Sequence, residues 1–371
     1  MKITLPRNDL LQALQLVSGA VEKRQTLPIL SHVLFHFDKK TLLITATDLE
    51  IELVAKLELT KAVEESFEIT VPARKLIDIC RSLSDDAILQ LDFKSNRLNI
   101  STGKGSRSRF ILSTLSAAEY PKVGKSDSLF SFTIPQSVFK YLLNKTYFAM
   151  AQQDVRYYLN GALFNVRKNL LRVVTTDGHR LALASYSGKF NVRDDLDIIV
   201  PRKGIMELLR LLNDEEDDVK VIIDTNHIHL VTPKFTFTSK LIDGKFPDFN
   251  RVIPKDTSKL ITINRSSFKD SLSRVAILCN EKYHGIRLDL EPNGMAVYAN
   301  NTDQEEAEEK LDIEYNGDKF DIGFNVNYLL DALASLPEGE VKLHMSDSNS
   351  SVLLEHADVK DCLYVVMPMR L

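Results

Sequence analysis

Apolar and polar residues alternate over two neighbouring stretches near the middle of the chain, Leu170–Val174 and Ala182–Tyr186. Such alternation predicts two strands, each with one buried face. Between them lies Thr175–Leu181, whose Asp-Gly pair is a strong signal for the tight turn of a hairpin. His179 and Arg180 then begin the returning strand. This pair is either a solvated hairpin tip or part of a binding site, and the rest of the chain has to decide between the two.

A strand followed by an amphipathic helix occurs three times at equal spacing. The strands are Ile3–Leu5, Phe132–Ile134 and Ile261–Ile263, and each leads into apolar residues that recur every three or four positions. That period places the apolar side chains on one face of a helix. Self-similarity at a fixed spacing predicts repeated structural units.

Three further landmarks recur in the same order in each unit: a Thr-Asp pair after a strand, a strand that enters a second short helix, and an apolar or aromatic residue before proline. These are Thr47-Asp48, Thr176-Asp177 and Thr302-Asp303; Val71–Leu76, Val200–Ile205 and Phe324–Leu329; and Tyr120-Pro121, Phe246-Pro247 and Met367-Pro368. We therefore predict an α+β fold of three homologous domains, at residues 1–124, 125–253 and 254–371. Each domain would pack two helices on antiparallel sheets, and Met367-Pro368 would lead into a free tail.

The bulk composition is that of an ordinary globular protein, because 44% of the 371 residues are hydrophobic and 26% are charged. No apolar run approaches the roughly 18 residues of a membrane span. The N-terminal residues lack the apolar core of a signal peptide. Cys80, Cys279 and Cys362 lie far apart without metal-type spacing, so we expect reduced, mostly buried thiols in a cytoplasmic protein.

The net charge of −4 excludes an overall basic footprint, but the charges are distributed unevenly. Five of the six predicted helices carry mainly Lys and Arg, as Arg74, Lys75 and Arg81 illustrate. Acidic residues gather instead in two predicted loops, at 214–218 and 305–309. One basic helix is an ordinary solvated face, but the same bias in five helices indicates an attraction for negative charge.

The ordered set of motifs resembles the bacterial sliding clamps, the beta subunits of DNA polymerase III. The resemblance covers the whole chain and rests on the threefold repeat, on Thr176–Leu181, on Val71–Lys75 and on the terminal Tyr364–Leu371. It implies a head-to-tail homodimer closed into a ring, with helices lining the hole and sheets outside. Duplex phosphates would attract the basic helices without base readout. The family is non-catalytic, needs no cofactor, and tethers a polymerase to DNA as a processivity factor.

The resemblance also implies the partners and the place of action. Expected partners are sequence-independent duplex DNA, a second copy of the chain, the DNA polymerase III alpha subunit, the clamp-loader delta subunit, other DNA polymerases, mismatch-repair proteins and DNA ligase. The expected location is the cytoplasm, in association with the nucleoid.

The family's pocket for partner peptides maps onto two parts of the chain. Its apolar members would bury the Leu and Phe anchors of a short extended peptide, and His179 and Arg180 would frame the pocket with hydrogen-bond donors. The matching residues are Leu159, Thr176, Gly178, His179, Arg180, Leu181, Pro247, Arg251 and Val252, then Asn325, Tyr328, Ser351, Val365, Val366, Met367, Pro368, Met369, Arg370 and Leu371. Asn349 stands where relatives often have an apolar residue.

The resemblance implies two further contacts. In the subunit interface, Phe110 and Leu112 would face Ile277 and Leu278 of the other copy, and head-to-tail contacts of this kind close into a ring when the rotation allows. Arg107 and Arg109 would meet the acidic residues Glu305, Glu306, Glu308 and Glu309. The residues that match DNA contacts are Arg24, Gln153, Tyr157, Tyr158, Arg202 and Lys203.

Single motifs allow other functions. An enzyme could use His179 with Asp177 and a nearby serine, but the chain lacks a nucleophile elbow and the spacing does not make a triad. Thr102–Ser106 lacks the spacing of a phosphate loop and fits a hairpin turn. The five consecutive acids at Asp214–Asp218 cannot all converge on one metal ion. A passive three-domain interaction module stays open, and retention on circular but not linear DNA would exclude it.

Overall fold

The computed structural model describes residues 2–22, 27–94, 96–102, 108–124, 128–190, 192, 195–255 and 257–370. The chain forms two compact units. Unit 1 comprises Met1–Gln136 and Arg210–Leu241, and unit 2 comprises Ser137–Leu209 and Ile242–Leu371.

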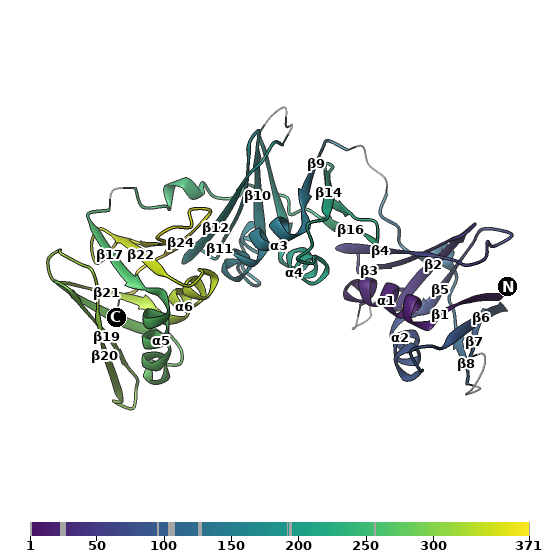
Figure 1. The fold of residues 1–371 in the computed structure, drawn as a ribbon, viewed down its shortest axis with the longest axis horizontal. Coiled ribbons are helices and arrows are strands. Elements are labelled where there is room, and N and C mark those ends of the chain that lie inside the picture. Colours follow the sequence, from purple (N-terminus) through teal and green to yellow (C-terminus); the bar gives the residue numbers. More distant parts are fainter. Residues whose placement is uncertain are drawn as a thin grey trace. The chain divides into compact units, whose positions relative to one another are not determined.

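Unit 1 contains a four-stranded sheet of order β1-β6-β7-β8 and an eight-stranded sheet of order β5-β2-β3-β4-β16-β15-β14-β9. Its strands are β1 (Lys2–Pro6), β2 (His32–Asp38), β3 (Thr41–Thr47), β4 (Ile51–Glu58), β5 (Phe67–Pro72), β6 (Ile88–Lys94), β7 (Arg97–Thr102), β8 (Arg109–Ser113), β9 (Phe130–Pro135), β14 (Asp218–Ile223), β15 (His227–Val231) and β16 (Phe235–Lys240). Its helices are α1 (Arg7–Val17) and α2 (Ala73–Ser82), with short 3₁₀ helices η1 (Ser18–Ala20), η2 (Pro28–Ser31) and η3 (Ala117–Glu119). β4 and β16 pair although they are far apart in sequence, so the larger sheet joins strands of two repeats (Figure 1).

Unit 2 repeats this plan with an eight-stranded sheet of order β13-β10-β11-β12-β24-β23-β22-β17 and a four-stranded sheet of order β20-β19-β18-β21. Its strands are β10 (Gly161–Arg167), β11 (Leu170–Thr176), β12 (Arg180–Ser187), β13 (Leu196–Pro201), β17 (Lys259–Asn264), β18 (Gly285–Glu291), β19 (Gly294–Asn300), β20 (Glu306–Asp312), β21 (Phe320–Asn325), β22 (Glu340–Met345), β23 (Val352–His356) and β24 (Cys362–Val366). The helices are α3 (Gln136–Asn144), α4 (Arg202–Leu211), α5 (Arg265–Val275) and α6 (Val326–Ser335), with η4 (Tyr147–Ala149), η5 (Tyr157–Leu159), η6 (Phe249–Arg251) and η7 (Ala276–Leu278). All strand pairings in both units are antiparallel, and β12 pairs with β24 of the next repeat.

The helices form where the apolar period predicts them. In α1, Leu10, Leu14 and Val17 are fully buried, and their spacing puts them on one helix face. Fully burying a side chain of this kind stabilises the fold by about 1.5–3 kcal/mol. This face packs against α2 and β4. The three predicted strand-and-helix starts are thus confirmed, at β1-α1, β9-α3 and β17-α5, as is the prediction of an α+β fold of repeated units.

Two other predictions about the chain can be compared with the structure. Cys80, Cys279 and Cys362 are all buried, as expected. The acidic residues at 305–309 do not form a loop, so that prediction was wrong. Glu306–Asp312 is β20, an edge strand that pairs with β19. An edge strand can be charged on its solvent side, and charge there discourages pairing with other chains.

The described helices include none long and apolar enough to cross a membrane. Within the same described residues, no group of three or more His, Cys, Asp or Glu side chains is arranged to hold a metal ion.

Candidate functional site

The Asp177-Gly178 hairpin tip is closed by its own side chains. Gly178 has a φ of 91°, a conformation that glycine adopts without strain. Its N–H donates to Thr176 Oγ1 at 3.1 Å, and the N–H groups of His179 and Arg180 donate to Asp177 Oδ1 at 2.9 and 3.0 Å. The predicted hairpin is therefore confirmed, and its turn is closed by the short polar side chains that favour such turns.

Arg180 ties this hairpin to two other elements. Its Nε donates to Asp177 Oδ2 at 3.0 Å, and its Nη1 donates to Asp331 Oδ2 of α6 at 2.5 Å. Its Nη2 donates to the Phe148 carbonyl at 2.7 Å, and the guanidinium lies 4.5 Å from the centre of the Tyr328 ring. The Arg180 side chain is 13% exposed. Because each of its three nitrogens donates within the chain, Arg180 holds the frame of the site in place.

A small apolar pocket lies beside the hairpin. Its volume of about 110 Å³ is on the scale of the roughly 150 Å³ cavity that holds one benzene ring. Behind it is a buried cluster that includes Leu163, Val174, Leu181 and Val365. The residues that line this apolar pocket are Arg156, Tyr158, Leu159, Thr176, Gly178, Arg180, Leu181, Phe246, Pro247, Phe249, Val252, Val365 and Met367. The pocket therefore suits one apolar side chain of a ligand.

The tail, residues 367–371, follows β24, and its first residue, Met367, forms part of the wall of the apolar pocket. Met367 donates its N–H to the His179 carbonyl at 2.9 Å, which fixes the tail against the hairpin. Met367 lines the pocket and is 36% exposed. Met369 instead donates its N–H to the Gly323 carbonyl at 2.7 Å, next to β21. The two methionines of the tail thus lie at different surfaces, Met367 at the apolar pocket and Met369 next to β21.

Nine of the residues predicted for the peptide pocket line the apolar pocket. They are Leu159, Thr176, Gly178, Arg180, Leu181, Pro247, Val252, Val365 and Met367. Sequence reasoning missed Arg156, Tyr158, Phe246 and Phe249 as lining residues. Phe246 carried a usable signal, because it precedes the proline of a repeated landmark.

The other predicted pocket residues that the structure describes are not part of this lining. His179 is exposed, and the Arg251 side chain is 86% exposed and pairs with Asp248 at 3.1 Å. Asn325 caps α6, because its Oδ1 accepts the Asn327 N–H at 2.9 Å. Tyr328 supports Arg180, as described above. Ser351 is half-buried, and Val366 is buried in β24. The remaining described members are Pro368, Met369 and Arg370. Leu371 lies outside the described residues.

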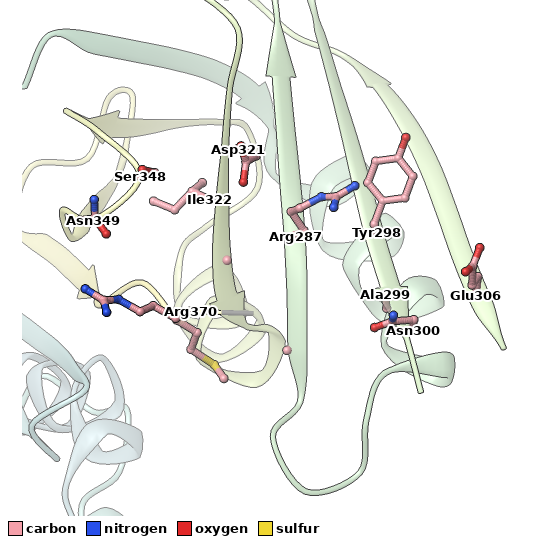
Figure 2. Close-up of a pocket in the computed structure, with 13 residues that line it drawn as sticks. Arg287, Tyr298, Ala299, Asn300, Glu306, Asp321, Ile322, Ser348, Asn349 and Arg370 are labelled. Atoms are coloured by element: carbon pink, nitrogen blue, oxygen red, sulfur yellow. The ribbon is translucent and has the colours of Figure 1, made fainter. Parts of the chain in front are cut away.

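Figure 2 shows a larger, shallower groove of about 860 Å³, built on the sheet β20-β19-β18-β21. Arg287 and Tyr298 lie on one side of it, and Ser348, Asn349 and Arg370 lie on the other. The Arg287 guanidinium is 4.9 Å from the centre of the Tyr298 ring. This groove shares no lining residue with the apolar pocket. Asn349, whose identity departs from the family pattern, therefore contributes to the groove and not to the apolar pocket.

The apolar residues predicted for the subunit contact lie in β8 and in η7. Phe110 is half-buried and Leu112 is 8% exposed in β8, an edge strand, whereas Ile111 between them is 48% exposed. Ile277 in η7 is 77% exposed, and Leu278 beside it is half-buried. Ile111 is thus an apolar surface residue that sequence reasoning missed.

The charged members of the predicted subunit contact divide into three cases. Arg109 is exposed in β8, and Arg107 lies outside the described residues. Glu306 is exposed at the start of β20. The other three acids have partners in their own chain. Glu305 accepts from Asn301, Glu308 accepts from the Tyr298 hydroxyl, and Glu309 accepts from Arg274. The Arg274 hydrogen bond lowers the pKa of Glu309.

The residues predicted to contact DNA have different environments. Gln153 is exposed with a φ of 56°, and Tyr157 is 73% exposed. Tyr158 is half-buried in the wall of the apolar pocket. Arg202 is half-buried at the start of α4 and donates to the carbonyls of Tyr147 and Met150, both at 3.4 Å. Burial lowers the pKa of Arg202. Lys203 is exposed, and Arg24 lies outside the described residues.

Comparison with known proteins gives a consistent result over the whole chain. Family models for the N-terminal, central and C-terminal domains of the DNA polymerase III beta subunit match residues 1–124, 133–248 and 250–370. The chain is 51% identical over 371 residues to the beta sliding clamp of Pseudomonas putida, and 46% identical to that of Escherichia coli strain K12, with full coverage of both proteins. The crystal structure of the DNA polymerase III subunit beta from Pseudomonas aeruginosa matches with a TM-score of 0.97 at 50% identity, covering all of both chains.

Proposed function

The chain belongs to the family of bacterial DNA polymerase III beta subunits, the sliding clamps, and on this premise we propose that its apolar pocket receives a short peptide from each protein that the clamp tethers. As a member of this family the chain is a non-catalytic processivity factor that encircles duplex DNA. A factor of this kind acts by raising the effective concentration of polymerase at the primer end.

The shape and chemistry of the apolar pocket support this proposal. Extended peptides gain affinity from main-chain hydrogen bonds and specificity from pockets for individual side chains. Here Leu181, Pro247 and Val252 offer apolar surface, and Met367 provides an unbranched thioether that repacks around different ligands. One peptide residue with a Leu or Phe side chain would fill the volume of about 110 Å³.

For the subunit contact we propose that β8 of one copy faces η7 and β20 of another. β8 and β20 stand at the ends of their sheets, so each has one side without a paired strand in its own sheet. The exposure of Ile277 and Ile111 supplies apolar surface for burial in such a contact. Arg109 and Glu306 provide opposite charges on these two edges.

The remaining assignments follow from the family and from exposure. We propose that Lys203, Tyr157 and Gln153 approach the DNA backbone, that Arg24 and Arg202 assist, and that Tyr158 serves the apolar pocket instead. The proposed domain limits are 1–124, 125–253 and 254–371. Proposed partners beyond DNA and the replicative polymerase are the clamp-loader delta subunit, other DNA polymerases, mismatch-repair proteins and DNA ligase, all met in the cytoplasm at the nucleoid.

Deleting the tail from Met367 to Leu371 tests the peptide assignment. The deletion begins after the last residue of β24, so it spares the strand pairing with β12. It should abolish binding of a fluorescent partner-motif peptide, measured by polarisation, and leave the dimer intact in sedimentation. The matched control is Leu260→Ala, which changes an exposed apolar residue outside the pocket lining. Wild-type affinity in the deletion variant would overturn the assignment.

A further inference from the structure

A cluster of exposed apolar side chains lies on the first repeat and shares no residue with the lining of the apolar pocket. Leu27, Leu49 and Leu115 are 47%, 42% and 42% exposed. Together with Pro28, Ile29, Glu119 and Pro121 they line a groove of about 460 Å³, here called the first-repeat groove. Surface apolar residues are usually scattered singly, and a contiguous patch of them marks an interaction site.

The hairpin at this groove has the same hydrogen bonds as the hairpin at the apolar pocket. The Leu49 N–H donates to Thr47 Oγ1 at 3.1 Å, as Gly178 does to Thr176 Oγ1. The N–H groups of Glu50 and Ile51 both donate to Asp48 Oδ1 at 2.9 Å, as those of His179 and Arg180 do to Asp177. The first-repeat groove is therefore the counterpart of the apolar pocket in the first repeat.

The apolar base of the first-repeat groove follows the same plan. Ile29, Leu30, Leu34 and Tyr120 form one buried cluster. The equivalent positions in the second repeat are Tyr158, Leu159, Leu163 and Phe246, which line the apolar pocket or the cluster behind it. In both repeats a 3₁₀ turn leads into the cluster, because the Leu30 N–H donates to the Leu27 carbonyl at 3.1 Å and the Leu159 N–H donates to the Arg156 carbonyl at 2.9 Å.

Two side chains make the first-repeat groove chemically distinct. Leu49 stands where the second repeat has Gly178, and it keeps a φ of 76°, which is a strained conformation for a bulky residue. Its apolar side chain is nevertheless exposed at the hairpin tip. The charged lining residue is Glu119, whereas the charged lining residues of the apolar pocket are Arg156 and Arg180. Among the described residues, none forms a hydrogen bond or ion pair with the exposed Glu119 carboxylate.

We infer that the first-repeat groove is a second docking site on the clamp, for an extended peptide segment that has apolar side chains next to a basic one. The apolar side chains pack on Leu27, Leu49 and Leu115, and the basic side chain pairs with Glu119. The choice of a peptide rests on the function proposed for the apolar pocket, which has the same backbone plan. The choice of a basic side chain rests on the acidic charge of the groove.

The test uses the full-length protein with labelled Leu, Ile, Val and Met methyl groups and two capped probe peptides. The probes share a Leu-Leu-Phe core and differ only in a flanking Lys or Glu. The Lys probe should shift the methyl signals of Leu49 and Leu115 and bind there at least threefold more tightly than the Glu probe. Signals of Val252 and Met367 report the apolar pocket separately, so failure at one site is distinguishable from failure at the other.

Two variants make the result specific. Leu49→Gly places in the first repeat the residue that the second repeat uses at a positive φ, so the hairpin is kept while the apolar contact is lost. It should weaken binding of the Lys probe at the groove at least tenfold and leave the Val252 shifts unchanged. Glu119→Lys should reverse the preference between the probes.

Three results would overturn the inference. The first is an absence of methyl shifts at the first-repeat groove with the Lys probe. The second is wild-type affinity at the groove in the Leu49→Gly variant. The third is concentration-dependent assembly beyond the dimer in sedimentation that Leu49→Gly removes, because the occupant of the groove would then be a second copy of the chain.

Discussion

Replacing Arg180 with methionine tests whether this residue frames the apolar pocket or binds the ligand. Methionine keeps an unbranched apolar stem and removes the guanidinium. Asp177, with a side chain that is 17% exposed, then loses its cation, and removing one partner of a buried ion pair costs about 3–5 kcal/mol. Asp331 is 46% exposed, so the loss of its ion pair with Arg180 costs less than about 1 kcal/mol. Because Asp177 keeps two backbone donors, we expect a total near the lower limit, about 3 kcal/mol.

Hydrogen exchange of the backbone amides in β12 and η4 measures this loss locally. A decrease of about 3 kcal/mol in the free energy of opening corresponds to roughly 150-fold faster exchange, since each 1.4 kcal/mol is about tenfold. The matched control is Asp331→Asn, which removes one charge but keeps an acceptor for Arg180. It should accelerate exchange by about fivefold or less, as expected for a half-exposed pair.

Two outcomes would refute this reasoning. If the backbone amides of β12 and η4 exchange at the same rate in the Arg180→Met and Asp331→Asn variants, the buried pair with Asp177 does not stabilise the hairpin as argued. If Arg180→Met leaves exchange unchanged but weakens peptide binding, Arg180 is a donor to the ligand, as the family resemblance implied. Polarisation measurements on the same two variants separate these cases.

Three further predictions concern other parts of the chain. The double substitution Ile277→Ala, Leu278→Ala should raise the dimer dissociation constant at least about 100-fold in sedimentation, because truncating a packed apolar side chain costs roughly 2–5 kcal/mol. A variant that is fully dimeric at nanomolar concentration would contradict the proposed interface. Lys203→Ala should lower the salt slope of DNA binding by about one unit, equally for all sequences; a changed sequence preference with an unchanged slope would contradict a phosphate contact. Burial lowers the pKa of His32 below its ordinary value of 6.5. As the pH falls, His32 therefore takes up a proton in the unfolded chain at a higher pH than in the folded chain, and stability is lost below pH 6.5. His32→Gln should flatten the pH dependence of urea unfolding in that range, and an unchanged slope would exclude His32 as its source.

Local signals predicted the elements, because their causes are local. The Asp177-Gly178 turn and the apolar period of α1 depend on residues a few positions apart, and both are confirmed. β20 was missed because its strand face is mostly charged. Four of its seven side chains are exposed, and Glu309 on the other face is partly covered by Arg274, which is far away in the sequence. A hydrophobic pattern does not reveal a strand of that kind.

Only part of the apolar pocket was predicted, because only some of its residues carry a local sequence signal. Residues in the hairpin and in β24 were found because they belong to recognisable motifs, whereas Phe249 and Arg156 have no motif of their own. The hydrogen-bond acceptors of the Arg180 guanidinium could not be predicted from the sequence. They include Asp331 and the Phe148 carbonyl, and the packing of α6 and η4 sets the distance of these two residues from the hairpin.

The two equivalent hairpins show which residues encode the turn and which encode the surface. Thr47-Asp48 and Thr176-Asp177 make the same side-chain to backbone hydrogen bonds, although a leucine follows the first pair and a glycine follows the second. The glycine is therefore not needed to form the turn. A Cβ atom at Gly178 would lie 3.1 Å from the Arg156 guanidinium, so glycine leaves room for that side chain at the apolar pocket. The position after the Thr-Asp pair thus sets the character of each surface, while the pair itself preserves the backbone that both surfaces share.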